Sequence, residues 1–347
     1  MSGLIQRESR ENALPETANR PALSVQGLST SFTKQGRDLK AVNNVSFDLA
    51  PGEILGLVGE SGSGKSITLR SLIGIVRPQG RIDGSVLWKG RNLVTMNEPQ
   101  LRKIRGREIA MIFQEPMSSL NPLLTIGLQI TENLKAHTSL GRQERQKRAI
   151  ELLDLVGIPA AASRLDDYPH QFSGGMRQRV MIAIALASNP ELLLADEPTT
   201  ALDVTIQDQI LRLIMDLRTE LNMAVILVTH DLGVVAQSCD RVAVMYAGRI
   251  IESGSVGTIL KAPQHPYTLG LLQSVPQDQP PRTPLFSIDG TPPALDDMPT
   301  GCAFAPRCQQ AQGTCLESAP DFSLVGSGHA AACHILETAR PSLGENK

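Results

Sequence analysis

The sequence predicts an α/β fold in which short buried strands alternate with helices around a largely parallel sheet. Three observations support this class. Apolar runs at residues 54–58, 192–195 and 224–229 are typical of buried strands. Each run ends in glycine or in polar residues. The amphipathic pattern over residues 206–221, between the last two runs, predicts a helix that covers the sheet.

Length and charge limit the class of protein further. The chain has 347 residues, which is enough for one large domain or for a main domain with an extension. It carries 33 basic and 35 acidic residues, so we expect no nucleic-acid partner bound through an extended basic face. No apolar run approaches the length of a membrane span. Residues 1–21 lack the apolar core of a signal peptide and predict a disordered tail.

Two stretches after this tail predict half-buried antiparallel strands. Residues 23–32 and 41–49 alternate apolar and polar side chains, and residues 34–40 form a polar loop between them. Phe32 comes just before that loop, where an aromatic ring could stack on an adenine ring. Ordinary core packing accounts for Phe32 equally well.

A glycine-rich turn follows the strand at residues 54–58 and leads into a helical pattern. The turn and helix start consist of Gly59, Glu60, Ser61, Gly62, Ser63, Gly64, Lys65 and Ser66. Glycines let the backbone curl so that its N–H groups point at phosphate oxygens, and the helix start adds the positive end of its dipole. Lys65 would reach the β- and γ-phosphates, and the Ser66 hydroxyl would bind Mg²⁺. The sequence therefore predicts a nucleotide-binding P-loop.

A long helical pattern separates this loop from the later strands. Residues 84–88 resume strand character, and from residue 99 to about residue 189 the pattern is helical. Proline and glycine divide this block into segments at residues 101–104, 126–134, 145–156 and 176–187. Because the block lies between elements of the nucleotide site, we expect an inserted helical subdomain over about residues 99–189.

Two carboxylates follow the apolar run at residues 192–195. Asp196 fits the carboxylate that holds Mg²⁺ through water in many P-loop enzymes, and Glu197 is placed to polarise the attacking water. A helix-capping pair is the alternative, which the presence of the P-loop disfavours. In open α/β sheets the chemistry lies at the carboxyl ends of strands, where residues 65–66, 196–197 and 230 are all expected.

Together these residues resemble the ATP-binding subunits of ABC transporters over residues 22–255. Gln114 is similar to the Q-loop glutamine that senses the γ-phosphate and faces the membrane subunit. Asp203 resembles the D-loop aspartate, and His230 resembles the switch histidine. Ser173, Gly174 and Gly175 are similar to the centre of the family's signature motif.

The signature departs from the usual LSGGQ, because Phe172 and Met176 stand at its first and last positions. The Ser-Gly-Gly centre is kept, and it offers a hydroxyl and bare N–H groups at a helix start. We therefore expect the anion site to persist without a polar contact from the fifth side chain.

Finer resemblance indicates the dipeptide and oligopeptide importer branch, which also includes nickel and glutathione systems. It rests on residues 114–122 (QEPMSSLNP), 172–179 (FSGGMRQR) and 265–268 (HPYT). The resemblance implies an ATPase, using ATP and Mg²⁺, that energises import of dipeptides or oligopeptides, with nickel or glutathione as alternative cargo. It implies three kinds of partner: a second ATPase subunit, identical or paralogous, two transmembrane permease subunits, and an extracytoplasmic substrate-binding protein. The chain would then act at the cytoplasmic face of the plasma membrane.

The resemblance also assigns roles within this machinery. Ser66, Gln114 and Asp196 would hold Mg²⁺, and the signature residues of the second subunit would close over the ATP. A groove near Met117, Leu120 and Pro122 would receive a cytoplasmic helix of a permease. Non-transport ABC ATPases of translation or repair carry tandem cassettes or a long coiled-coil insertion, which this chain lacks. Intact Glu197 and His230 disfavour a purely regulatory module, and the signature motif disfavours an unrelated P-loop kinase or GTPase.

Four of the five cysteines lie near the end of the chain, at Cys302, Cys308, Cys315 and Cys333. A proline-rich, polar stretch beyond about residue 274 precedes them and predicts a linker. Disulfides are not expected in a protein without a secretion signal. Four thiolates could hold an iron–sulfur cluster or a zinc ion.

The gaps of five, six and seventeen residues between these cysteines do not match the tight pairs of structural zinc sites. From spacing alone, a cluster, zinc and unligated thiols are equally compatible. The resemblance favours a [4Fe–4S] cluster, with His329 and His334 as possible substitute ligands. We expect residues 256–347 to form the C-terminal extension of the oligopeptide-transporter type.

Overall fold

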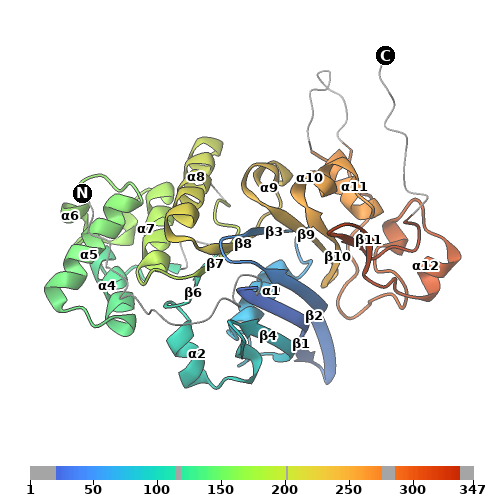
Figure 1. Cartoon of the computed structure of the whole chain (residues 1–347), viewed down its shortest axis with the longest axis horizontal. Coiled ribbons are helices and arrows are strands. Elements are labelled where there is room, and N and C mark those ends of the chain that lie inside the picture. Colours follow the sequence, from blue (N-terminus) through green and yellow to red (C-terminus); the bar gives the residue numbers. More distant parts are fainter. Residues whose placement is uncertain (1–20, 115–118, 201, 276–285, 337–347) are drawn as a thin grey trace, which may run out of the picture.

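The computed structural model describes residues 21–114, 119–200, 202–275 and 286–336 (Figure 1). Within these residues the largest sheet has eight strands, in the order β11-β12-β10-β9-β3-β8-β7-β6. They are β3 (Ile54–Val58), β6 (Ile109–Ile112), β7 (Leu192–Asp196), β8 (Ala224–Val228), β9 (Arg241–Tyr246), β10 (Arg249–Ser255), β11 (Ser323–Gly326) and β12 (His329–Ala331). In Figure 1 this sheet crosses the middle of the molecule, between the helices α4–α7 and the C-terminal elements.

The central strands of this sheet are parallel, as the sequence predicts. β3 pairs with both β8 and β9, and β7 pairs with both β6 and β8. Every residue of β3, β7 and β8 is buried. A strand covered on both faces needs apolar side chains on both faces, which explains why these strands are continuous apolar runs.

A second sheet is antiparallel and has the order β2-β1-β4-β5. Its strands are β1 (Leu23–Lys34), β2 (Arg37–Leu49), β4 (Arg81–Trp88) and β5 (Arg91–Asn92). The predicted polar loop over residues 34–40 is wrong in length, because the two strands continue until only Gln35 and Gly36 separate them. Both residues have positive φ, 51° and 75°, which closes the hairpin in two residues.

Most of the helices occupy positions that the sequence indicates, with shifted ends, whereas the helices over residues 161–164 and 232–238 lie outside the predicted segments. They are α1 (Lys65–Leu72), α2 (Glu98–Ile104), α4 (Ile126–His137), α5 (Arg142–Leu155), α6 (Ala161–Arg164), α7 (Gly174–Leu186), α8 (Val204–Leu221) and α9 (Leu232–Ser238). The block expected to be helical also contains β6, which the sequence analysis did not predict. β6 pairs parallel with β7, Ile109 against Leu192. Its four apolar residues carry no period that separates a short buried strand from a helix turn.

The C-terminal region, defined here as residues 256–336, packs on the core sheet. It contains α10 (Val256–Lys261), α11 (Pro266–Gln273) and α12 (Gly313–Glu317), together with β11 and β12. β12 pairs antiparallel with β10, Glu252 against Ala331, so the C-terminal region extends the sheet of the core. No helix in the described part of the chain is long and apolar enough to span a membrane.

His265 begins the C-terminal segment HPYT as a buried residue, with 2% of its surface exposed. It is the N-cap of α11, where its Nδ1 accepts a hydrogen bond from the Tyr267 N–H at 3.0 Å. An acceptor needs a free lone pair, so this contact requires the neutral ring. Burial lowers the pKa of His265 to about 3.

We expect the unfolding free energy of the chain to depend on pH because of the lowered pKa of His265. Its pKa is lower in the folded chain than in the unfolded chain, so its contribution is present above pH 6.5 and is lost as pH falls toward 3. The chain should lose about 1 kcal/mol of unfolding free energy through this residue between pH 7.5 and pH 5.5. Chemical denaturation at both pH values would measure it. His265→Asn keeps a capping acceptor without titrating, so an equal loss in this variant would contradict the prediction.

Candidate functional site

The glycine-rich loop lies where backbone packs directly on backbone. Gly64 is the N-cap of α1 with φ of 102°, and a Cβ there would lie 2.7 Å from the Ala41 carbonyl oxygen. Gly59 has φ of 149°, and a Cβ there would lie 2.2 Å from the Met245 carbonyl oxygen. Any side chain at either position would collide with fixed backbone, so the loop conformation depends on glycine.

Lys65, the first residue of α1, is turned onto the carbonyls of its own loop. Its Nζ donates to the Gly59 oxygen at 2.7 Å and to the Glu60 oxygen at 2.8 Å. Ser63 Oγ lies 3.3 Å from the same nitrogen. Burial lowers the pKa of Lys65, and the charges of Glu197, Asp196 and Glu60 oppose this shift. A bound phosphate would therefore have to compete with loop carbonyls for this ammonium.

Asp196 ends β7 with a fully buried carboxylate. Its Oδ1 accepts a hydrogen bond from Ser66 Oγ at 2.7 Å, whereas its Oδ2 is buried without a hydrogen-bond partner. The nearest cation is Arg70, at 3.8 Å from Oδ2. Burial raises the pKa of Asp196, opposed by Ser66 and Arg70. A hydroxyl beside a carboxylate with an unused oxygen fits a hard cation such as Mg²⁺.

Glu197 gathers three side chains around one carboxylate oxygen. Thr200 Oγ1 donates to Oε2 at 2.8 Å and Gln114 Nε2 donates at 3.3 Å. His230 Nδ1 lies 3.4 Å from the same oxygen. The structure thus brings together the predicted residues at positions 114, 197 and 230, together with Thr200, which is absent from the predicted site residues. A hydroxyl one turn after the carboxylate is the local signal for it.

The backbone of Glu197 is also unusual. Its φ is +47°, in the left-handed region, while its N–H donates to the Val228 carbonyl oxygen at 3.1 Å. A non-glycine residue in this region stores strain, and such residues concentrate at functional sites. The bond to β8 holds the carboxylate at the carboxyl edge of the sheet.

The remaining residues of the predicted site differ in how far they are exposed. Phe32 is half-buried against Gly80, where a Cβ would lie 2.8 Å from its ring, so core packing accounts for part of its surface. Ser61 and Gly62 are exposed, whereas Ser63 is buried. Of the residues expected near a permease helix, Leu120 is buried and Pro122 is exposed, and Met117 lies outside the described residues.

The signature residues lie apart from the P-loop, on the helical side of the molecule (Figure 1). Ser173 is the N-cap of α7, and its hydroxyl accepts a hydrogen bond from the Met176 N–H at 3.3 Å. Ser173 and Gly174 are exposed and Gly175 is half-buried. Asp203, the N-cap of α8, is exposed as well. These residues are therefore free to face a second molecule.

The five cysteines are free thiols. Cys315 is buried, and Cys302, Cys308 and Cys333 are half-buried. Burial raises the pKa of the three half-buried thiols, that of Cys333 to about 11, and the neighbouring cysteines add to each shift. The four thiols share one neighbourhood, because Cys302, Cys315 and Cys333 pack around one small cluster that includes Ala305, and the Cys308 N–H donates to the Ala305 carbonyl oxygen at 3.2 Å.

This neighbourhood is not a formed metal site. Among the described residues, no three His, Cys, Asp or Glu side chains are grouped so as to hold a metal ion. Both histidines expected as substitute ligands have other partners: His329 pairs with the buried Glu252 at 2.8 Å, and His334 contacts the Ser318 carbonyl oxygen at 2.9 Å. Both imidazole rings are thus engaged with other groups in this structure, and their role as substitute ligands stays a prediction.

Comparison with known protein families yields two matches. Residues 42–200 match the ABC transporter family, and residues 251–315 match the C-terminal region of oligopeptide and dipeptide transporters. The second match covers α11 and three of the four C-terminal cysteines.

Relatives and solved structures agree with these matches. A putative peptide import ATP-binding protein of Brucella abortus is 53% identical, covering 90% of this chain and 94% of its own length. The dipeptide transport ATP-binding protein DppD of Bacillus subtilis is 50% identical, with coverage of 90% and 94%. The ATP-binding cassette MJ0796, solved as a dimer bound to ADP and phosphate, is 30% identical with a TM-score of 0.61, covering 67% of this chain and 98% of that one.

Substitution of the P-loop glycines at positions 62 and 64 should have different effects. Gly62 has φ of 78° but open space around a Cβ, so Gly62→Ala should lower the unfolding free energy by about 1 to 2 kcal/mol through backbone strain alone. Gly64→Ala adds the collision with Ala41 and should lose more stability and also bind ATP more weakly. Chemical denaturation and ATP titration would compare the two variants. Equal losses in both would contradict the packing argument.

Proposed function

This chain belongs to the peptide-import ATP-binding subunits of ABC transporters, and we propose that it binds and hydrolyses ATP to energise the import of dipeptides or oligopeptides. The observation that carries the proposal is the convergence of the P-loop, Asp196 and the Glu197 cluster at one edge of the sheet. Phosphoryl transfer uses cations, carboxylates and backbone N–H donors around the phosphates, and this edge of the sheet supplies all three kinds of group.

The P-loop would hold the phosphates through its backbone and through Lys65. Residues 59–66 offer N–H groups and the start of α1, and Lys65 would exchange the carbonyls of Gly59 and Glu60 for the β- and γ-phosphates. Phe32 would stack on the adenine ring. In this proposal the loop needs little rearrangement, because only the Lys65 side chain has to change partners.

Hydrolysis would use the residues around Asp196 and Glu197. Ser66, Gln114 and Asp196 would hold Mg²⁺, which when bound neutralises phosphate charge. The Glu197 carboxylate would orient the attacking water, and His230 would contact the γ-phosphate. The contacts of Gln114 and His230 with Glu197 support this assignment, since the three side chains already point at one place.

The site would be completed by a second subunit. Ser173, Gly174 and Gly175 of that subunit would close over the ATP, and Asp203 would communicate between the two sites. Their exposure and their separation from the P-loop support this arrangement. Two permeases and an extracytoplasmic binding protein complete the importer in this proposal, with the chain peripheral at the cytoplasmic face of the membrane.

We propose the domain boundaries that the sequence predicts. Residues 22–255 would be the ABC domain, with its helical subdomain within about residues 99–189, and the tail expected over residues 1–21 lies, apart from Pro21, outside the described residues. Residues 256–347 would be the C-terminal extension. The matched ranges 42–200 and 251–315 support the two main parts.

The cysteines at positions 302, 308, 315 and 333 would hold a [4Fe–4S] cluster. Their shared neighbourhood supports this proposal, while the lack of a grouped ligand set means that the sulfurs would have to move together on binding. Binding of a cluster would order a region with little apolar core of its own.

Glu197→Gln tests the hydrolytic role. The variant should keep ATP affinity and lose about 10²- to 10³-fold in hydrolysis rate, because the amide cannot accept the proton of water. Glu191→Gln is the control at the opposite end of β7, where Glu191 pairs with Lys89 at 2.6 Å. Phosphate release would measure both. Near-normal turnover of Glu197→Gln would refute the assignment.

Metal content tests the cysteine proposal. The full chain, purified without oxygen, should contain about four irons per molecule and absorb visible light. Cys308→Ser should lose most of this iron. Stoichiometric zinc with no visible absorption, or no metal at all, would overturn the cluster.

A further inference from the structure

Arg307 is the most fully bonded arginine at the boundary between the C-terminal region and the core, and its five N–H groups all have acceptors. Two go to the carboxylate of Glu60, at 2.7 and 3.0 Å, and one goes to the Tyr246 hydroxyl at 3.3 Å. The other two go to the carbonyl oxygens of Asp289 and Ile288. Only 5% of the side chain is exposed. A guanidinium satisfied in this way has one fixed orientation.

Glu60, which receives this fork, is the second residue of the P-loop turn. Its backbone N–H donates to the Tyr267 hydroxyl at 2.8 Å, and its carbonyl oxygen accepts from Lys65. The side chain and N–H of this residue are thus both bound by the C-terminal region, through Arg307 and α11. The peptide that faces the ammonium of Lys65 is therefore positioned from outside the core.

The aromatic packing around Arg307 keeps this arrangement rigid. The guanidinium carbon lies 5.8 Å from the Tyr246 ring centre and 5.9 Å from that of Phe304. Tyr246 also packs on Tyr267, with ring centres 4.7 Å apart. Cations over aromatic faces are attracted by the ring, and here the rings also pack against the guanidinium, whose side chain is 5% exposed. The pair is thus stronger than an exposed surface salt bridge.

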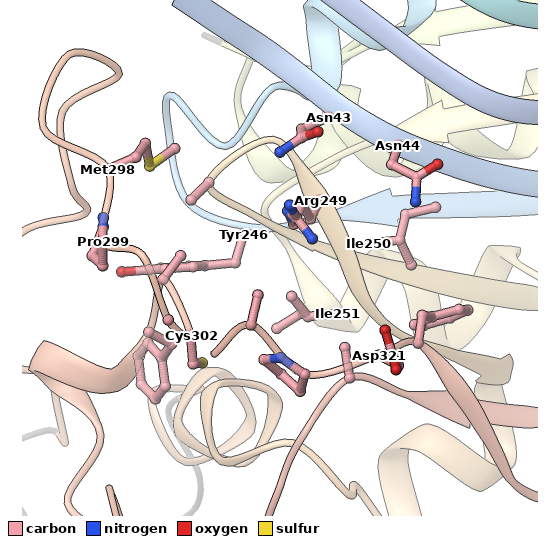
Figure 2. Close-up of a pocket in the computed structure, with 18 of the residues that line it drawn as sticks. Asn43, Asn44, Tyr246, Arg249, Ile250, Ile251, Met298, Pro299, Cys302 and Asp321 are labelled. Carbon is pink, nitrogen blue, oxygen red and sulfur yellow. The ribbon is translucent and has the colours of Figure 1, made fainter. Parts of the chain in front are cut away.

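The turn that carries Arg307 is built between two of the C-terminal cysteines. The Ala305 N–H donates to the Cys302 oxygen at 3.0 Å, and the Cys308 N–H donates to the Ala305 oxygen at 3.2 Å. Cys302 and Tyr246 line one cavity, with a volume of about 180 Å³. Figure 2 shows both side chains at this cavity. The position of Arg307 therefore follows the conformation of the cysteine segment.

We propose that Arg307 is a positioning residue for nucleotide binding: through Glu60 it holds the P-loop in the shape that receives the phosphates. The C-terminal region then sets the ATP affinity of the core. This inference rests on the proposed function, because it takes the P-loop as the ATP site. A small displacement of a phosphate-binding N–H is enough to weaken binding, since the donors must all meet the same oxygens.

Positioning of the loop and simple charge balance predict different effects of substitution on ATP binding. If Arg307 only offset the charge of Glu60, then Glu60→Gln would tighten ATP binding by removing a negative charge, and Arg307→Met would weaken it. If the pair positions the loop, both variants weaken binding, by about tenfold each. The double variant should then be no weaker than the weaker single variant, since both remove one interaction.

The experiment is a titration of the full chain with a fluorescent N-methylanthraniloyl derivative of ATP in the presence of Mg²⁺, with thermal denaturation as a check of folding. Arg307→Lys is included because it keeps the charge and loses the fork; it should weaken binding as well. Glu53→Gln is the control, since Glu53 pairs with Arg241 at the opposite end of β3. The affinity of this variant for the ATP derivative should equal that of the unsubstituted chain.

Each result decides something. Tighter or unchanged binding by Glu60→Gln, or losses that multiply in the double variant, would overturn the positioning role while leaving the proposed function intact. Failure of the unsubstituted chain to bind the probe would overturn both.

Discussion

Close contact of backbone with backbone around the P-loop is the constraint on which the rest of the site depends. The Ser63 carbonyl oxygen accepts a hydrogen bond from the Gly248 N–H at 2.9 Å, and the Gly248 oxygen accepts from the Asn43 N–H at 2.8 Å. These bonds join the loop to the β9–β10 turn and to β2. Both sheets therefore meet at the P-loop, and neither can shift without moving it. For this reason the carboxylates at the carboxyl end of β7 keep one geometry relative to the loop.

The site balances its charges internally. Lys65 is buried beside Asp196 and Glu197, and Arg70 lies 3.8 Å from the Asp196 carboxylate. Burial alone would favour neutral side chains, and the opposite charges offset this tendency. ATP brings several negative charges to a place that holds both cations and carboxylates. In the proposed site Asp196 would bind a divalent cation and Glu197 would orient water, which would give each carboxylate a reason to lie next to the phosphates.

Local pattern predicts the parts of this molecule whose cause is local. β3, β7 and β8 are continuous apolar runs because both faces are covered, and the P-loop shows in its glycines because only they fit its backbone. β6 was missed, because four apolar residues beside helices have no distinguishing period. The partnership of Arg307 with Glu60 joins residues 247 positions apart, and the Tyr267 hydroxyl accepts a hydrogen bond from the N–H of the same glutamate. Such contacts exist only once the C-terminal region has folded onto the core.

The pairing of β12 with β10 has a consequence for biosynthesis. The ribosome makes β10 well before β12, so the growing chain carries β10 with one unpaired edge until His329–Ala331 emerge. An open edge that includes Ile250 and Ile251 is a template for pairing with other chains. The last described strand of this sheet therefore covers an edge that could otherwise pair with other chains, and a chain without that strand would leave one edge of β10 open.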